Sequence, residues 1–190
     1  MAVNTAWRYD NSGALGFRRG DEVHVTDWGQ GAVRKVRDQW SLPVDSMYDQ
    51  PSAIIHYPSG GMAFIASDGL HVHFTDQSWT KIGDGWTTLP EEWKDKGVET
   101  AWRYDNSGAL GFRRGDEVHV TDWGQGTVKK VRDQWSLPTD SMYDRPLAII
   151  HYPSGGMAFI ASDGLHVHLT DQSWTKIGDG WTTLPEEWKE

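Results

Sequence analysis

Residues 53–74 read AIIHYPSGGMAFIASDGLHVHF, and this stretch decides the fold class. It contains three short runs of β-branched, aromatic and other apolar residues, separated by turn sequences at residues 58–61 and 67–69. Residues 70–74 alternate between apolar and polar side chains, which is the period of a half-buried strand. A fourth, weaker run near Lys81 leads to Trp86 and Leu89. The segment therefore predicts an antiparallel meander of four short strands.

The same pattern recurs along the whole chain. Residues 5–94 align without gaps to residues 100–189, and only six of these 90 positions differ. The differing pairs are Ala32/Thr127, Arg34/Lys129, Val44/Thr139, Gln50/Arg145, Ser52/Leu147 and Phe74/Leu169. Each copy contains an older repeat at an offset of 47, which aligns Phe17 with Phe64 and His24 with His71. The chain is thus four units of about 48 residues.

Four short strands in every repeat of 40–50 residues are typical of a propeller blade. We therefore predict an all-β chain that forms one four-bladed β-propeller over residues 1–190. The predicted blades cover about residues 5–51, 52–99, 100–146 and 147–190. Because the two halves are nearly identical, we expect a monomer with two-fold pseudo-symmetry, in which ligand sites away from the axis come in pairs.

Three segments resemble hemopexin repeats. Residues 14–27, ALGFRRGDEVHVTD, are similar to the family's aromatic-aromatic-Lys-Gly-Asp core, and residues 35–43 and 81–90 resemble its blade ending, Ile-x-x-x-Trp-x-Gly-Leu-Pro. The units open with Thr-Ala, Ser-Ala or Leu-Ala where the family usually has Asp-Ala. The chain also has no cysteine for the disulfide that joins the first and last blades in animal members.

The resemblance implies a non-catalytic recognition module for a ligand such as haem, a metal ion or a protein partner. It also implies that backbone carbonyls at the start of each blade hold an ion, such as calcium or sodium, in a central channel. In this sequence those positions are Thr5, Ser52, Thr100 and Leu147. Fucose-type lectins are a second resemblance, because their propellers are also built from Trp-rich two-blade units. A purely structural or designed repeat protein without a ligand is a third interpretation.

Histidines supply the first candidate sites. The repeat places one at the same aligned position of every unit, namely His24, His71, His119 and His166. Four imidazoles that met on one axis would form a metal or haem site. The alternative, which we favour, is four separate histidines hydrogen-bonded within their own blades.

Two His-Val-His pairs are the second candidate. Strand alternation places His71 beside His73, and His166 beside His168, on one face, where each pair can share a metal ion. A closed site needs further ligands. The candidates are Asp76, Asp171, His56 and His151. Structural histidines on a half-exposed strand are the commoner alternative.

The tryptophans fall into two groups. Trp40, Trp86, Trp135 and Trp181 precede the Leu-Pro ending of every unit, which predicts packing between blades. Trp7, Trp28, Trp102 and Trp123 do not repeat fourfold. If exposed, these four would suit stacking against a sugar or another amphipathic ligand. The alternative is that they form a satellite core.

Composition narrows the function classes. The net charge of −9, from 27 acidic and 18 basic residues, argues against nucleic acid as a partner. No apolar run approaches the length of a membrane span, and the first residues lack the features of a signal peptide. No nucleophile, metal-protease or phosphate-loop motif is present, so we expect no enzymatic activity. Cysteine is absent, and the sequence does not indicate a compartment.

Overall fold

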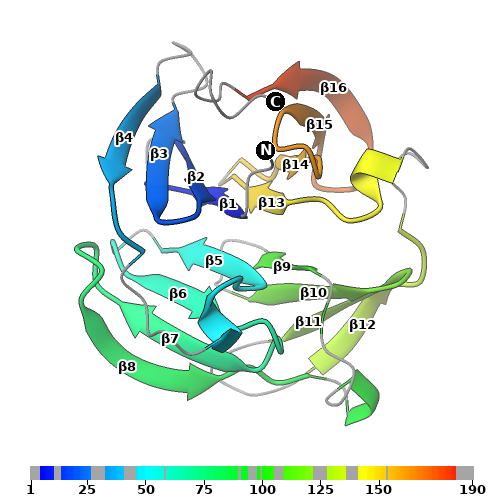
Figure 1. The fold of residues 1–190 in the computed structure, drawn as a ribbon. Coiled ribbons are helices and arrows are strands. Elements are labelled where there is room, and N and C mark those ends of the chain that lie inside the picture. Colours follow the sequence, from blue (N-terminus) through cyan, green and yellow to red (C-terminus); the bar gives the residue numbers. More distant parts are fainter. Residues whose placement is uncertain are drawn as a thin grey trace. The chain divides into compact units, whose positions relative to one another are not determined.

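The computed structural model describes residues 5–10, 14–26, 33–40, 46–57, 59–89, 91–93, 98, 100–104, 109–121, 128–135, 141–152 and 154–182. Within these ranges the structure is almost entirely β, with three short 3-10 helices. The chain divides into two compact units, and the strands of each are labelled in Figure 1. Unit 1 comprises Met1–Ser41 and Pro138–Glu190, and unit 2 comprises Leu42–Leu137.

Each unit contains two sheets of four antiparallel strands, which we call blades and number along the chain. In unit 1, blade 1 consists of β1 (Thr5–Arg8), β2 (Leu15–Arg19), β3 (Glu22–Thr26) and β4 (Val33–Arg37). Blade 4 consists of β13 (Ala148–His151), β14 (Met157–Ile160), β15 (His166–Thr170) and β16 (Lys176–Trp181). The 3-10 helix η3 (Ser141–Tyr143) precedes blade 4.

In unit 2, blade 2 consists of β5 (Ala53–His56), β6 (Met62–Ile65), β7 (His71–Thr75) and β8 (Lys81–Trp86). Blade 3 consists of β9 (Thr100–Arg103), β10 (Leu110–Arg114), β11 (Glu117–Thr121) and β12 (Val128–Arg132). The 3-10 helix η1 (Ser46–Tyr48) precedes blade 2, and η2 (Glu91–Trp93) connects blades 2 and 3. The predicted four meanders of four strands are confirmed.

Each unit is held together by apolar side chains from the inner strands of its two blades. In unit 2 the core packs Ala53, Ile55 and Ile65 of blade 2 against Leu110 and Phe112 of blade 3. In unit 1 the core packs the corresponding side chains of blade 4 against blade 1; it includes Ala148, Ile150, Ile160, Leu15 and Phe17. Burial of such side chains is the main driving force for association of the sheets.

The middle hairpins differ between blades, and this sets the strand register. In blade 1, Arg19 pairs with Glu22 across a tight turn at Gly20, whose φ of +60° favours glycine. In blade 2 the corresponding loop is longer, and Ile65 pairs with Val72. As a result the cross-strand partner of Phe17 is His24, whereas the partner of Phe64 is His73.

The prediction that His24 and His71 share one strand position is therefore wrong. By cross-strand pairing with a phenylalanine, the equivalent histidines are His24, His73, His119 and His168. All four are buried. A 3-10 helix supplies an aromatic ring to three of them, as Tyr48 does to His73, Trp93 to His119 and Tyr143 to His168. These histidines belong to the packing of their blades.

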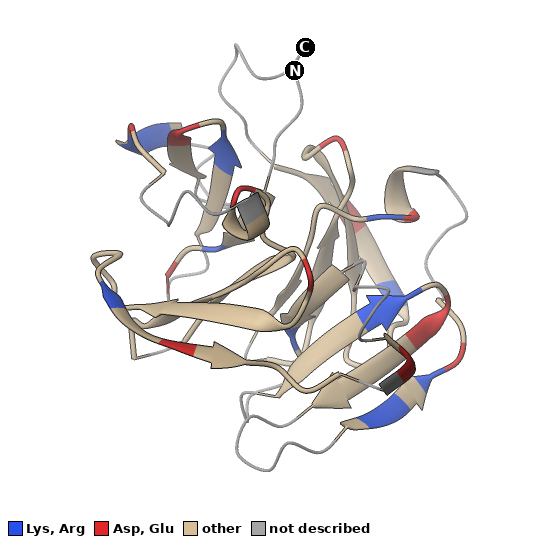
Figure 2. Cartoon of the chain, turned by 60° about the horizontal axis from the view of Figure 1, so that its bottom comes forward, with Lys and Arg blue, Asp and Glu red and all other residues tan. Residues whose placement is uncertain are grey.

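Charged residues recur on the outermost strands of the blades (Figure 2). In each blade a lysine on that strand forms an ion pair with an aspartate three residues later. The pairs are Lys35–Asp38, Lys81–Asp84, Lys130–Asp133 and Lys176–Asp179, at 2.9–3.0 Å. Such exposed pairs contribute little to stability, so the inner apolar faces carry the fold.

Candidate functional site

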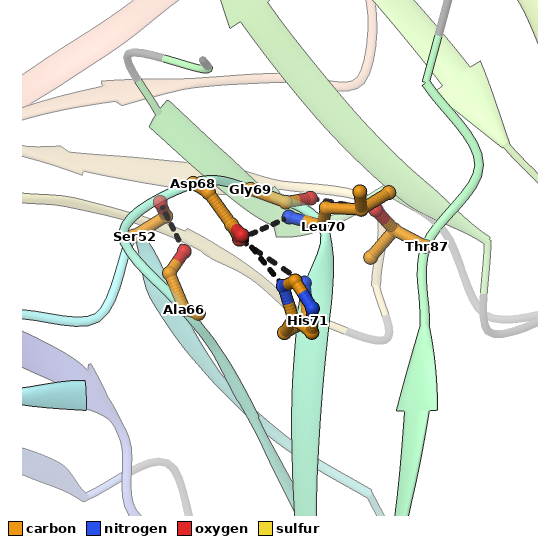
Figure 3. Close-up of polar contacts among 7 residues, drawn as sticks. All are labelled: Ser52, Ala66, Asp68, Gly69, Leu70, His71 and Thr87. Atoms are coloured by element: carbon orange, nitrogen blue, oxygen red, sulfur yellow. Dashed lines mark hydrogen bonds and ion pairs between the residues drawn. The ribbon is translucent and has the colours of Figure 1, made fainter. Parts of the chain in front are cut away.

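The loop between β6 and β7 is organised by the carboxylate of Asp68. Its Oδ1 accepts hydrogen bonds from the backbone N–H groups of Leu70 at 2.8 Å and His71 at 3.1 Å. Its Oδ2 lies 2.6 Å from Nδ1 of the His71 ring (Figure 3). Aspartate is well suited to this place because its short side chain bonds the backbone two and three residues ahead.

Two hydroxyl groups brace the same loop. Thr87 donates to the carbonyl of Gly69 at 2.6 Å, and Ser52 donates to the carbonyl of Ala66 at 2.8 Å (Figure 3). Gly69 itself has a φ of +75°, a conformation that a residue without a Cβ adopts at little cost. The loop thus presents His71 on a framework fixed from both sides.

These contacts also set the charge of Asp68. Partial burial alone raises the pKa of a carboxyl group, but the backbone N–H groups of Leu70 and His71 and the His71 ring stabilise the anion. Together they hold the pKa of Asp68 below its ordinary value of 3.8. The carboxylate is therefore ionised at neutral pH and holds the Nδ1 side of the imidazole.

An exposed indole lies next to this Asp–His pair. His71 pairs with Trp86 across β7 and β8, and their ring centroids are 6.1 Å apart. Trp86 is 65% exposed, which is unusual for so large an apolar side chain. Asp84 pairs with His73 and so points to the same face as His71 and Trp86. We call Asp68, His71, Asp84 and Trp86 the blade 2 site.

Blade 4 contains a second copy of this arrangement. Asp163 Oδ2 lies 2.6 Å from Nδ1 of His166, whose ring centroid is 6.1 Å from that of Trp181. Trp181 is also 65% exposed, and Asp179 pairs with His168 across the strands. We call Asp163, His166, Asp179 and Trp181 the blade 4 site. The two sites differ in one supporting contact. Leu147 replaces Ser52, so blade 4 lacks the hydrogen bond that the Ser52 hydroxyl donates to the loop carbonyl in blade 2.

The matching tryptophans of blades 1 and 3 are covered. The guanidinium of Arg18 lies 3.8 Å from the centroid of the Trp40 ring, and that of Arg113 lies 3.9 Å from Trp135. In blade 2, Ile65 aligns with Arg18 but lies on the face opposite Trp86, because Ile65 pairs with Val72 and Val72 with Gly85, the neighbour of Trp86. The prediction that these four tryptophans pack between blades is therefore wrong for Trp86 and Trp181.

Two of the four tryptophans predicted to stack on a ligand are buried. Trp7 and Trp102 are each 1% exposed and pack edge-on against Trp40 and Trp135 at 6.4 and 6.5 Å. The stacking hypothesis is wrong for these two, because their rings are core side chains. Trp28 and Trp123 lie outside the described residues.

The predicted metal ligands do not come together. Within the described ranges, no three His, Asp or Glu side chains are grouped as a metal site. His71 is engaged by Asp68, and His73 is buried against Tyr48 and Phe64. Asp76 accepts backbone hydrogen bonds from Ser78 and Thr80, and Asp171 does the same from Ser173 and Thr175. Both aspartates therefore act as turn formers.

The residues predicted to hold a channel ion, and the two histidines proposed as further metal ligands, lie at or next to strand ends. Thr5 and Thr100 begin β1 and β9 and are buried, whereas Ser52 and Leu147 directly precede β5 and β13. His56 and His151 end β5 and β13. The channel ion at the four blade starts and the binding of haem stay predictions.

A hollow of about 500 Å³ also lies in unit 2, between η2 and the hairpin that joins β10 to β11. It is lined by Trp93 and by charged side chains that include Glu117 and Asp133. Lys130 lies 2.9 Å from Asp133 and 4.0 Å from Glu117, so ion pairs within blade 3 partly neutralise this acidic lining. We assign no ligand to it.

Sequence reasoning missed the role of Asp68 and Asp163. The signal was present, since Ser-Asp-Gly marks a turn before each His-Val-His run. It predicted a turn and did not indicate that the same carboxylate would orient the next histidine. The exposure of Trp86 and Trp181 had no sequence signal, because all four blade-ending tryptophans stand in the same local pattern.

The chain is similar to several solved plant propellers. A hemopexin-fold protein from cow pea superposes with a TM-score of 0.62 at 9% identity, covering 93% of this chain and 92% of that one. A plant lectin with two metal-binding sites from Cicer arietinum gives 0.61 at 11% identity, with 99% and 96% covered. A Cicer arietinum albumin that shows hemagglutination gives 0.58 at 10% identity, with 96% and 94% covered.

These likenesses establish the fold, which is a four-bladed β-propeller of the hemopexin type. No family model matches the chain, and no curated protein matches it in sequence. None of the helices in the described part of the chain has the length and apolar character that crossing a membrane requires.

Proposed function

We propose that the chain is a non-catalytic, bivalent carbohydrate-binding module, with one saccharide in the blade 2 site and one in the blade 4 site. The observation that carries this proposal is the exposed indole of Trp86, and of Trp181, beside a histidine held by a fixed carboxylate. The arrangement combines a flat apolar platform with convergent polar groups, which are the two elements of a sugar site.

Each part of the blade 2 site has a task in this proposal. The apolar C–H face of a pyranose ring lies on the indole of Trp86. Asp68 occupies Nδ1 of His71, which leaves Nε2 of the ring to bond a sugar hydroxyl. The Asp84 carboxylate, 61% exposed, lies on the same face and accepts hydrogen bonds from neighbouring hydroxyls.

The surroundings support binding rather than covalent catalysis by a side-chain nucleophile. A histidine held by an aspartate activates a side-chain nucleophile only when a hydroxyl or thiol is free beside it. The two hydroxyls that brace this loop, those of Ser52 and Thr87, both donate to backbone carbonyls. The chain has no cysteine. Two of the similar structures are described as a lectin and as a hemagglutinating albumin, which also favours a saccharide.

The test compares exposed side chains of the same strand. Trp86→Ala with Trp181→Ala removes both platforms, whereas Ile82→Ala with Ile177→Ala removes side chains of equal exposure from the same strands. A glycan array identifies the ligand, and titration gives its Kd. We expect the tryptophan double variant to bind about tenfold more weakly or worse, since it loses the apolar area buried on the indole as well as about 0.5–1.5 kcal/mol of stacking.

The isoleucine control should keep the wild-type Kd. Far-ultraviolet circular dichroism and thermal unfolding establish that both double variants are folded. An unaltered Kd in the folded Trp86→Ala, Trp181→Ala variant contradicts the proposed sites. Absence of binding to any glycan contradicts the proposed ligand class.

A further inference from the structure

The two units contain the same blade–blade interface but differ in how the chain connects it. In unit 2, blades 2 and 3 follow each other directly through η2. In unit 1, blade 4 packs against blade 1, and the whole of Leu42–Leu137 lies between them in the sequence. Unit 1 is therefore closed by non-covalent contacts between two distant segments.

The duplication makes the two interfaces matched in detail. Ala6 of blade 1 corresponds to Ala101, and Ala148 of blade 4 corresponds to Ala53. All four alanines are buried in the two cores. The cation–π contacts at the blade boundaries match as well, with Arg8 at 5.5 Å from Tyr152 and Arg103 at 5.6 Å from Tyr57. The interfaces thus share these buried alanines and cation–π contacts, and they differ in connection and at two duplicated positions, Ser52/Leu147 and Phe74/Leu169.

We infer that the face of blade 1 that packs on blade 4 is an exchange interface, and that its partner is a second copy of this chain. In the exchanged dimer, blade 1 of each chain packs on blade 4 of the other. Every apolar contact of unit 1 is then recovered between chains, because the sequences that meet are unchanged. Domain exchange of this kind is a low-cost route to dimers.

Concentration decides between the closed monomer and the dimer. Within one chain, blade 4 meets blade 1 at an effective concentration that depends on the intervening segment Leu42–Leu137. Raising the protein concentration during refolding therefore favours exchange, whereas dilute refolding favours the monomer. The inference does not depend on the ligand. If the proposed saccharide sites are present, the exchanged dimer carries four of them.

A matched pair of cysteine variants tests the inference in the full chain, which has no native cysteine. Ala6→Cys with Ala148→Cys places one thiol on each side of the unit 1 interface, on β1 and β13. Ala101→Cys with Ala53→Cys does the same in unit 2, on β9 and β5. Each variant is unfolded, refolded over a range of protein concentrations, oxidised and run on a non-reducing gel.

We expect the unit 1 variant to give covalent dimers whose fraction rises with concentration, while the unit 2 variant gives only chains cross-linked internally. Internal cross-links alone in the unit 1 variant, at every concentration, overturn the inference. If the disulfide does not form, a second experiment on the wild-type chain tests the same inference. Tagged and untagged wild-type chains should co-purify when refolded together and not when mixed after refolding. Failure to co-purify after joint refolding also overturns it.

Discussion

At the scale of the residue, the two most buried histidines show how packing sets charge. His73 and His168 lie against aromatic rings on both sides, Tyr48 and Phe64 for the first, and Tyr143 and Phe159 for the second. Burial lowers the pKa of both imidazoles below the ordinary value of 6.5, and a nearby lysine, Lys81 or Lys176, adds to the effect. The folded protein therefore keeps these rings neutral at neutral pH.

This predicts acid sensitivity in a defined direction. Below about pH 6.5 the unfolded chain takes up protons at His73 and His168 that the folded chain does not, so stability is highest above this pH. It declines as the pH falls from 6.5 toward the lower folded pKa. Replacing both residues, His73→Phe and His168→Phe, should flatten this decline, and either change alone should remove half of the effect.

Urea unfolding at pH 7.5 and pH 5.5 measures the two free energies for each variant. The relevant quantity is the difference between the pH values, so a variant of altered absolute stability is still informative. A double variant with the same pH dependence as wild type contradicts the assignment.

At the scale of the element, β8 and β16 differ in what lies across from a glycine. A Cβ added at Gly85 would meet Cε2 of Phe74 at 2.9 Å, whereas a Cβ at Gly180 would have no atom within 4 Å. The neighbouring strand explains this, because Leu169 replaces Phe74 in the second copy. The duplication thus allows the same glycine-to-alanine substitution to be compared at a crowded position, Gly85, and at an open one, Gly180.

We expect Gly85→Ala to destabilise the protein by about 1 kcal/mol or more, as overpacking does. Gly180→Ala should be neutral or slightly stabilising, since alanine loses less backbone entropy than glycine on folding. Thermal and urea unfolding of the two single variants make the comparison. Equal effects would show that crowding by Phe74 does not distinguish the strands.

Element-scale patterns were also what the sequence predicted best. Turn signals and alternation identified the strands of each meander, because both depend on neighbours along the chain. The alignment at a constant offset of 47 is wrong after β6. The loop that contains Asp68 is longer than the turn in blade 1, so His73 pairs with Phe64 as His24 pairs with Phe17. The exposure of Trp86 is a tertiary relation, because Arg18 covers Trp40 whereas Trp86 pairs with His71 on the face opposite Ile65.

At the scale of the whole molecule, the duplication gives two copies of the proposed site. Blade 2 in unit 2 and blade 4 in unit 1 each carry one Asp–His–Trp cluster, and blades 1 and 3 carry covered tryptophans in their place. The sequence predicted that off-axis sites come in pairs. The structure proposes which residues form the pair, and each site can be removed without touching the other.

Calorimetric titration of the chain with the glycan selected on the array tests the central claim most directly. We predict two equivalent sites per chain for the wild type, one for Trp86→Ala, one for Trp181→Ala and none of comparable affinity for the double variant. Two sites retained in either single variant, or a wild-type chain with one site, would contradict the account.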